Sequence, residues 1–437
     1  MSNATRELLL RLAPSIYGPT ILFTLGAYAM LPIVPLIAVS QGAGLGLSGV
    51  IASTVVVGRL VGNLPASWLV ARAGERIAML IASGVALLGA LGVALAPGLA
   101  VLGASAFVIG FAEAAFGLAR HSLMTTRVPV TFRARALSLI GGSHRFGRFA
   151  GPFLAAGLLG ITGDQHAPVW AFVVCLALTA LLVGFAPDPE RLLSHGPAGE
   201  AGPGRGAGAP RGSDGMLSAI RHGHAPLLRI GGSAAILSGL RSVKDVLLPL
   251  WGVSIGLDAT SVALVVGIAG TIDFALFYAS GQVMDRFGRL WAALPAMIAM
   301  ALSFLVLAAT HDLPGAAWWL TGCAVVIGIG NGLSSGILLT LGADLAPRDN
   351  PAPYLAAWRT LTDLGGATAP LAVSAIAAAS LPLASAVAGM LAVAGAAGFA
   401  RWIPRYIPRL RPRVGRNPDA DRGSDTSDPG PGAPSTR

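Results

Sequence analysis

The chain alternates between long apolar segments and short polar ones. A helix needs about 20 consecutive apolar residues to cross the hydrocarbon core of a bilayer. Twelve segments meet that requirement, six on each side of a polar break, at residues 15–38, 49–70, 77–95, 99–120, 136–160, 168–186, 227–253, 261–283, 290–309, 315–340, 352–377 and 381–403. The pattern predicts an all-α integral membrane protein with twelve transmembrane helices in two six-helix bundles.

The segments outside the two bundles have a different composition. The run from Ser194 to Gly215 is rich in glycine and proline and cannot bury apolar area. The chain is therefore expected to divide into five parts: a short N-terminal tail (1–14), an N-terminal bundle (15–186), a flexible linker (187–226), a C-terminal bundle (227–403) and a disordered tail (404–437).

The positions of the basic residues predict the orientation in the membrane. Of the 30 Lys and Arg residues, 24 fall in the tails and in the loops of one side, and the loops of the other side hold none. Loops rich in Lys and Arg stay in the cytoplasm. We therefore expect a plasma-membrane protein with both termini cytoplasmic, and we interpret the net charge of +10 as a topology signal rather than a nucleic-acid interface.

The composition excludes several function classes. Hydrophobic residues make up 54% of the chain and charged residues 11%, whereas soluble domains carry roughly 25% charged residues. The single lysine, Lys244, follows Val243, so the chain has no Gly-Lys-Ser/Thr phosphate loop and is not expected to use ATP. Cys175 and Cys323 lie in apolar runs without metal-ligand spacing, and we expect no cofactor, no metal and no enzyme activity.

The two halves of the chain repeat each other. Offsets of 214 and 218 residues align equivalent positions, namely Pro35 with Pro249, Gly74 with Gly288, and Gly147 with Gly365. Parallel six-helix repeats are one arrangement that transporters use, with the substrate site between the halves near the midplane of the membrane.

The loop between the eighth and ninth segments carries a recognisable motif. Its residues Gly281, Asp285, Arg286, Gly288 and Arg289 fill every position of a GxxxDRxGR pattern. The pattern resembles a signature of the major facilitator superfamily, and the resemblance extends from about Pro19 to Arg401. It implies the facilitator fold and a cytoplasmic latch that breaks when the protein opens inward.

The corresponding loop of the first half is a degraded copy of this motif. Arg72, Gly74 and Arg76 are retained, whereas Ala71 stands where the family has Asp and Glu75 where it has Arg. The departure weakens the expected latch of the N-terminal half.

The fifth segment contains Gly147, Gly151 and Pro152. These residues resemble the GxxxGP part of the motif of drug:proton antiporters, the exporter branch of the superfamily. Two glycines at i and i+4 let two helices pack closely. The chain departs from the branch at Ser138, where the motif has glycine, and at Ala106, where the branch has a proton-relay arginine.

Ten charged residues lie inside the predicted segments, away from the segment ends. If they faced lipid they would cost about 25 kcal/mol together, so they must line a watery cavity or pair. The ten are Arg59, Glu113, Arg145, Arg148, Arg241, Lys244, Asp245, Asp273, Arg359 and Asp363. Six are basic and four acidic, which favours a cavity that tolerates anionic or zwitterionic ligands.

Helical spacing suggests roles for some of these charges. Arg241 and Asp245 share a helix face, as do Arg359 and Asp363, so we expect two ion pairs within helices. Glu113 and Asp273 have no basic residue three or four positions away and are the candidates for carrying protons. The internal repeat aligns Arg59 with Asp273, and Glu113 with Asn331.

We therefore expect a monomeric secondary active transporter that exports small organic molecules in exchange for protons, with the lipid bilayer, the substrate and protons as its partners. Two alternatives with the same fold are an importer of an anionic metabolite and a transport-inactive membrane sensor. The Gly46-Leu-Ser-Gly49 pattern matches that of intramembrane proteases, but such short patterns are frequent in a chain with 58 glycines.

Overall fold

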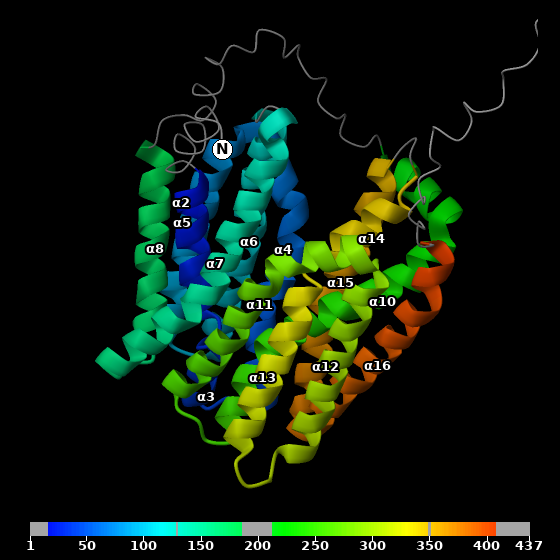
Figure 1. Ribbon diagram of the computed structural model, residues 1–437. Coiled ribbons are helices and arrows are strands. Elements are labelled where there is room, and N and C mark those ends of the chain that lie inside the picture. The colour runs from blue at the N-terminus through cyan, green and yellow to red at the C-terminus, as the bar shows by residue number, and fades with distance from the viewer. Residues whose placement is uncertain (1–15, 128–129, 186–211, 348–350, 408–437) are drawn as a thin grey trace, which may run out of the picture.

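The computed structural model describes residues 16–127, 130–185, 212–347 and 351–407, and all the regular secondary structure in these ranges is helical (Figure 1). Twelve spans are present, as predicted. The N-terminal half consists of α2 (Gly18–Met30) with α3 (Val34–Ser40), α4 (Leu45–Ala73), α5 (Glu75–Ala94), α6 (Leu99–Arg127), α7 (Val130–Thr162) and α8 (Ala167–Phe185). The C-terminal half consists of α10 (Gly212–Ser254), α11 (Ala259–Phe287), α12 (Leu290–Thr310), α13 (Ala316–Leu333) with α14 (Ile337–Leu345), α15 (Pro351–Ala377) and α16 (Leu381–Tyr406).

Most of the spans are predominantly apolar. Within the described residues, nine are long and apolar enough to cross a membrane. The remaining three are α7, α10 and α15, and these helices carry seven of the ten charged residues expected inside the membrane. The charges are thus concentrated on three spans, which positions them for a shared site.

The two halves are built from the same helix pairs, which confirms the internal repeat. In the first half α2 packs on α7, α4 on α6 and α5 on α8, and in the second half α10 packs on α15, α11 on α13 and α12 on α16. Glycines make the closest contacts. A Cβ at Gly110 would lie 1.8 Å from the carbonyl oxygen of Val55, and one at Gly365 would lie 2.3 Å from that of Ala235.

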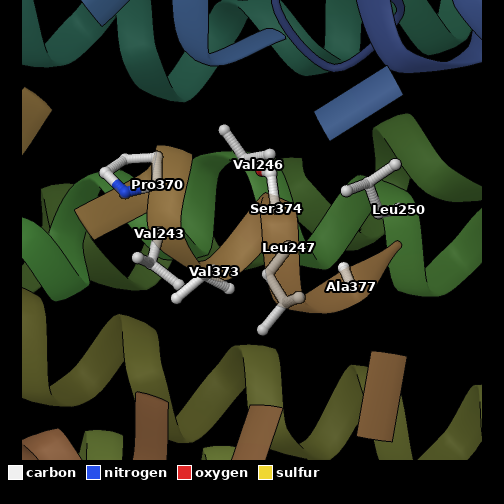
Figure 2. Close-up of a pocket in the computed structure, with 8 residues that line it drawn as sticks. All are labelled: Val243, Val246, Leu247, Leu250, Pro370, Val373, Ser374 and Ala377. Carbon is white, nitrogen blue, oxygen red and sulfur yellow. The ribbon is translucent and has the colours of Figure 1, made fainter. Parts of the chain in front are cut away.

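The halves meet along two seams, between α4 and α15 and between α7 and α11. On the first seam Gly46 contacts Ala378 closely, and the hydroxyls of Ser53 and Ser374 lie 3.5 Å apart. Ser374 also borders an apolar space between α10 and α15 that is too small for water (Figure 2). These contacts lie near the start of α4 and the end of α15, which we call the outer end of the molecule.

The opposite end, which carries the α4–α5 and α11–α12 loops, is called the basic end. Exposed side chains lie towards this end of α11 and α15: Tyr278 is 78% exposed and the Arg359 side chain 70%. The ribbons of the two halves also diverge in this direction (Figure 1). The halves are therefore closed at the outer end and separated at the basic end.

Helix α10 corrects one predicted boundary. It begins at Gly212, so residues 212–226, which were predicted to belong to the linker, are helical. The glycine- and proline-rich composition ends there, and Met216, Leu217 and Ala219 favour a helix. The predicted N-terminal tail, the rest of the linker from 187 to 211 and the predicted tail beyond residue 407 lie outside the described residues.

Candidate transport site

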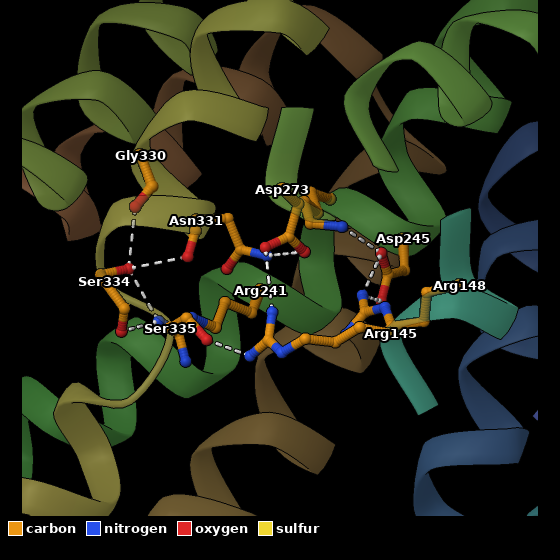
Figure 3. A network of polar contacts seen from close by, with 10 residues as sticks. Arg145, Arg148, Arg241, Asp245, Asp273, Gly330, Asn331, Ser334 and Ser335 are labelled. Carbon is orange, nitrogen blue, oxygen red and sulfur yellow. Dashed lines mark hydrogen bonds and ion pairs between the residues drawn. The ribbon is translucent and has the colours of Figure 1, made fainter. Parts of the chain in front are cut away.

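Helix α7 joins the two halves through two ion pairs. Its Arg145 lies 3.2 Å from a carboxylate oxygen of Asp273 on α11, and its Arg148 lies 3.1 Å from one of Asp245 on α10 (Figure 3). All four side chains are largely buried. Both arginines belong to the N-terminal half and both carboxylates to the C-terminal half, so the pairs bridge the interface that must rearrange in alternating access.

The predicted pair between Arg241 and Asp245 is wrong. Arg241 instead donates two hydrogen bonds of 2.7 Å to Ser334, one to its carbonyl oxygen and one to its hydroxyl. Asp245 accepts from Lys244 at 2.5 Å and from Arg148. Residues at i and i+4 share a helix face, but here the tertiary partners on α7 and on the α13–α14 junction prevail.

The tenth span is interrupted between α13 and α14. Ser334, Ser335 and Gly336 form the break. Arg241 from the same half holds Ser334, and Arg145 from the other half donates to the Ser335 hydroxyl. Arginines from both halves therefore fix this break, and sequence reasoning missed both serines because neither belongs to a motif.

Glu113 and Asp273 both have basic partners on other helices, which spacing along their own helices does not reveal. Arg59 on α4 donates to Glu113 on α6 at 2.9 Å, so this pair lies within the N-terminal half. Asp273 binds Arg145 and also accepts from the Asn331 side chain at 2.7 Å. A search at i±3 and i±4 detects partners on the same helix only, and these partners come from other helices.

The predicted pair between Arg359 and Asp363 is confirmed. The two groups lie 3.6 Å apart on α15, and the Asn63 side chain of α4 donates to Asp363 at 3.5 Å. The Arg359 side chain is exposed, which places this pair on the open, basic-end side of the interface.

A small cavity separates the halves beside the ion pairs. Its volume is about 30 Å³, and it is lined by Tyr28, Leu31, Ala52, Val55, Val56 and Arg59 of one half and by Ser242, Asp245 and Val246 of the other. A space of this size holds roughly one or two waters. The Arg148 guanidinium lies 4.9 Å from the centre of the Tyr28 ring, so Tyr28 helps to hold this arginine.

The aromatic residues near the site differ in position. Phe277 lies beneath Arg145, with 4.2 Å between the guanidinium carbon and the ring centre. Trp251 is fully buried and packs edge-on against His311, away from the ion pairs. Tyr278 is exposed. Of these three aromatic residues, Phe277 alone contacts a charged group of the site.

The turn after α11 requires a glycine. Gly288 has a φ of +91° and its repeat partner Gly74 a φ of +78°, values that side-chain-bearing residues rarely adopt. Arg289 lies 2.8 Å from Asp344 and 3.5 Å from Asp285. The hydrogen bond to Asp344 raises the pKa of Arg289 above its ordinary value. The motif therefore ties α11, α12 and α14 together within one half.

The basic residues of the predicted latch stay within their own halves. Arg72 lies 4.6 Å from the Trp68 ring centre, Arg76 donates to the carbonyl oxygens of Val183 and Gly184, and Arg286 lies over Phe287. A Cβ at Gly281 would meet no atom within 4 Å. Gly281 therefore makes no close helix contact in this conformation, in which the halves are separated at the basic end.

The glycines of the fifth span pack as predicted. A Cβ at Gly147 would lie 2.1 Å from the Thr24 hydroxyl, and one at Gly151 would lie 2.7 Å from the carbonyl oxygen of Leu25. Both contacts bring α7 onto α2, and Pro152 lies within α7. The close packing fixes the helix that presents Arg145 and Arg148.

Two repeated six-helix bundles, joined at their interface by buried ion pairs, define a multi-pass secondary transporter rather than an enzyme. A sequence profile of the Major Facilitator Superfamily matches residues 19–370. The chain belongs to this superfamily. Among curated proteins, no sequence matches it.

Three solved structures of similar fold are distant in sequence. A POT family transporter in complex with a thioalcohol-conjugated peptide has a TM-score of 0.71 at 13% identity, covering 92% of this chain and 97% of that one. The same family in complex with 5-aminolevulinic acid gives 0.71 at 12% identity, with the same coverage. The xylose transporter XylE from E. coli, in a partially occluded inward-open conformation, gives 0.65 at 13% identity, covering 89% and 99%. These similarities show the shared fold.

Proposed function

We propose that the protein exports small organic molecules in exchange for protons, by rocking its two halves about the central site. The proposal rests on the two ion pairs that link arginines of α7 to Asp245 and Asp273. A proton on either carboxylate removes its negative charge and weakens the bridge between the halves. Loss of the proton restores the bridge, so protonation is coupled to the change in conformation.

The proposed orientation places the basic end in the cytoplasm of a plasma-membrane protein with both termini cytoplasmic. The excess of Lys and Arg on that side supports it. With this orientation, the described conformation faces inward and is ready to take up a cytoplasmic substrate. The contacts of Arg289 with Asp285 and Asp344 stay within the C-terminal half, which agrees with an inward-facing state.

The packing of Gly147 and Gly151 on α2 supports export as the direction. These residues resemble the antiporter motif and make the close helix contact for which it is suited. Glu113, which was predicted from spacing to carry a proton, is paired with Arg59 inside one half, so we assign the coupling step to Asp245 and Asp273.

Uptake of an anionic metabolite is the second candidate function. The central network holds four cations, Arg145, Arg148, Arg241 and Lys244, against two carboxylates, which leaves a surplus of two positive charges to attract an anion. Structural neighbours include a D-xylose–proton symporter. Direction therefore has to be measured.

Inside-out vesicles with an imposed proton gradient, acidic inside, test both candidates. A panel of cationic, neutral and anionic compounds is added outside, and their accumulation is followed. Accumulation that collapses with the gradient supports proton-coupled export. Efflux of a preloaded anion driven by the same gradient supports uptake in the cell. No flux and no exchange for any compound would favour a transport-inactive sensor.

A further inference from the structure

The basic end of α16 carries a cluster of arginines around one indole. The guanidinium carbons of Arg229, Arg401 and Arg405 lie 4.4, 5.2 and 5.1 Å from the ring centre of Trp402. Arg229 comes from α10 and also donates to the Tyr406 hydroxyl at 2.8 Å. We call these five residues the Trp402 cluster.

The Trp402 cluster holds positive charge without a counter-charge. All three arginines are exposed, and no carboxylate of the described residues lies within ion-pair distance of any of them. Three cations around a single ring repel one another, and cation–π attraction to one indole offsets this repulsion only in part. An anion bound among the guanidiniums would remove the repulsion.

The position of the cluster indicates which anion would be present. It lies on the last turns of the final span, where a tryptophan marks the membrane–water interface. Earlier in α16, Met390, Leu391 and Val393 are exposed, as expected of a helix on the lipid-facing periphery. From Arg401 to Arg416 the sequence holds six arginines and no acidic residue. Basic segments directly beside a span favour anionic lipids.

We propose that the Trp402 cluster binds the phosphate of an anionic phospholipid, with phosphatidylglycerol as the test ligand. Guanidinium groups match phosphate oxygens with paired, charge-assisted hydrogen bonds. Arg229 links α10 to this site, so a bound lipid would join the first and last spans of the C-terminal half. The proposal is independent of substrate and of transport direction.

Native mass spectrometry of the full-length protein in detergent, titrated with phosphatidylglycerol or phosphatidylcholine, tests the proposal. The triple variant Arg229→Gln/Arg401→Gln/Arg405→Gln is expected to weaken phosphatidylglycerol binding roughly 100-fold, and Arg405→Gln alone about 5-fold. Arg72→Gln is the matched control, because Arg72 also lies over an indole at the basic end, and among the described residues no second arginine stacks on that ring. It should change binding less than twofold.

Each outcome decides the proposal. Selective binding of phosphatidylglycerol that is lost in the triple variant supports it, and the single variant gives the same direction if the triple variant fails to fold. Equal binding of both lipids, or triple-variant binding within twofold of wild type, overturns it. Glycerol 1-phosphate is added as a competitor. If it displaces the lipid at equal concentration, the site takes soluble phosphate esters and the assignment to lipid is wrong.

Discussion

The substitution Asp273→Asn tests the bridge between the halves most sharply. Asp273 accepts from Arg145 across the interface and from Asn331 within its own half. Asparagine keeps the shape of the side chain, but it has one oxygen for these two donors and no charge. One buried donor therefore loses its partner, and Arg145 loses its counter-ion.

The structure sets the size of the effect. The Asp273 side chain is 9% exposed and that of Arg145 21%, so the pair is largely shielded from solvent. Losing one partner of such a pair costs about 3 kcal/mol. If the pair separates when the halves rock, the full cost falls on the described conformation, and its population relative to the outward-facing one drops by roughly 150-fold.

Cross-linking at the outer end measures that population. The hydroxyls of Ser53 and Ser374 lie 3.5 Å apart, so Ser53→Cys/Ser374→Cys is expected to form a disulfide when the outer end is closed. Adding Asp273→Asn should slow this cross-linking strongly. The control Glu113→Gln breaks an ion pair within one half and should leave the rate unchanged. A wild-type rate with Asp273→Asn would refute the reasoning.

Three further predictions concern the gate, the helix packing and a helix cap. Asp285→Asn should lower turnover at normal membrane insertion, measured as initial transport rate per inserted protein, because the motif loses the negative charge beside Arg289. Asp312→Asn, in an exposed loop, should leave turnover unchanged. Gly110→Ala should abolish folding, because its Cβ would lie 1.8 Å from the carbonyl oxygen of Val55. The loss is seen as aggregation in size-exclusion chromatography. A Cβ at Gly84 meets open space, so the control Gly84→Ala should fold normally. Asp258→Ala should lower the free energy of unfolding by about 1 kcal/mol, because the Asp258 side chain caps the N-terminus of α11. A hydrogen bond from Ser261 holds the pKa of Asp258 below its ordinary value of 3.8. The stabilisation is therefore present at neutral pH and is lost as the pH falls through that lowered pKa. A melting temperature of Asp258→Ala equal to that of wild type at pH 7 would contradict this.

The fold could be predicted from the sequence because each span can be recognised from its own stretch of residues. About 20 apolar residues suffice to identify a helix that crosses the membrane. Gly288 in the motif is consistent with a tight turn between two such helices. The repeat then fixed the pairing of the helices, since equivalent glycines such as Gly147 and Gly365 make close contacts in both halves.

The partners of the site charges could not be predicted in the same way. The sequence located Arg145, Arg148, Asp245 and Asp273 inside the membrane, because charge there is costly. Their pairing depends on the rotation of each helix about its axis and on which helix faces it. Spacing along one helix contains neither quantity, and it therefore assigned Asp245 to Arg241 instead of to Arg148.

The hydrogen-bonding role of Ser334 was missed for a different reason. A serine in an apolar helix usually bonds back to a carbonyl of its own helix, and Ser334 does so with Gly330. Its second role, as a partner of Arg241, requires the break between α13 and α14. Gly332 and Gly336 lie at that break, but a chain with 58 glycines has many such positions, so the three-dimensional structure is needed to locate it.

The central claim is that Asp245 and Asp273 couple protons to the movement of the halves. The most direct test compares uphill transport with substrate exchange in the same vesicles, for wild type, Asp245→Asn and Asp273→Asn. The account predicts that both variants lose accumulation driven by the proton gradient and keep exchange of substrate at equal concentrations. Gradient-driven accumulation at the wild-type level in both variants would contradict it.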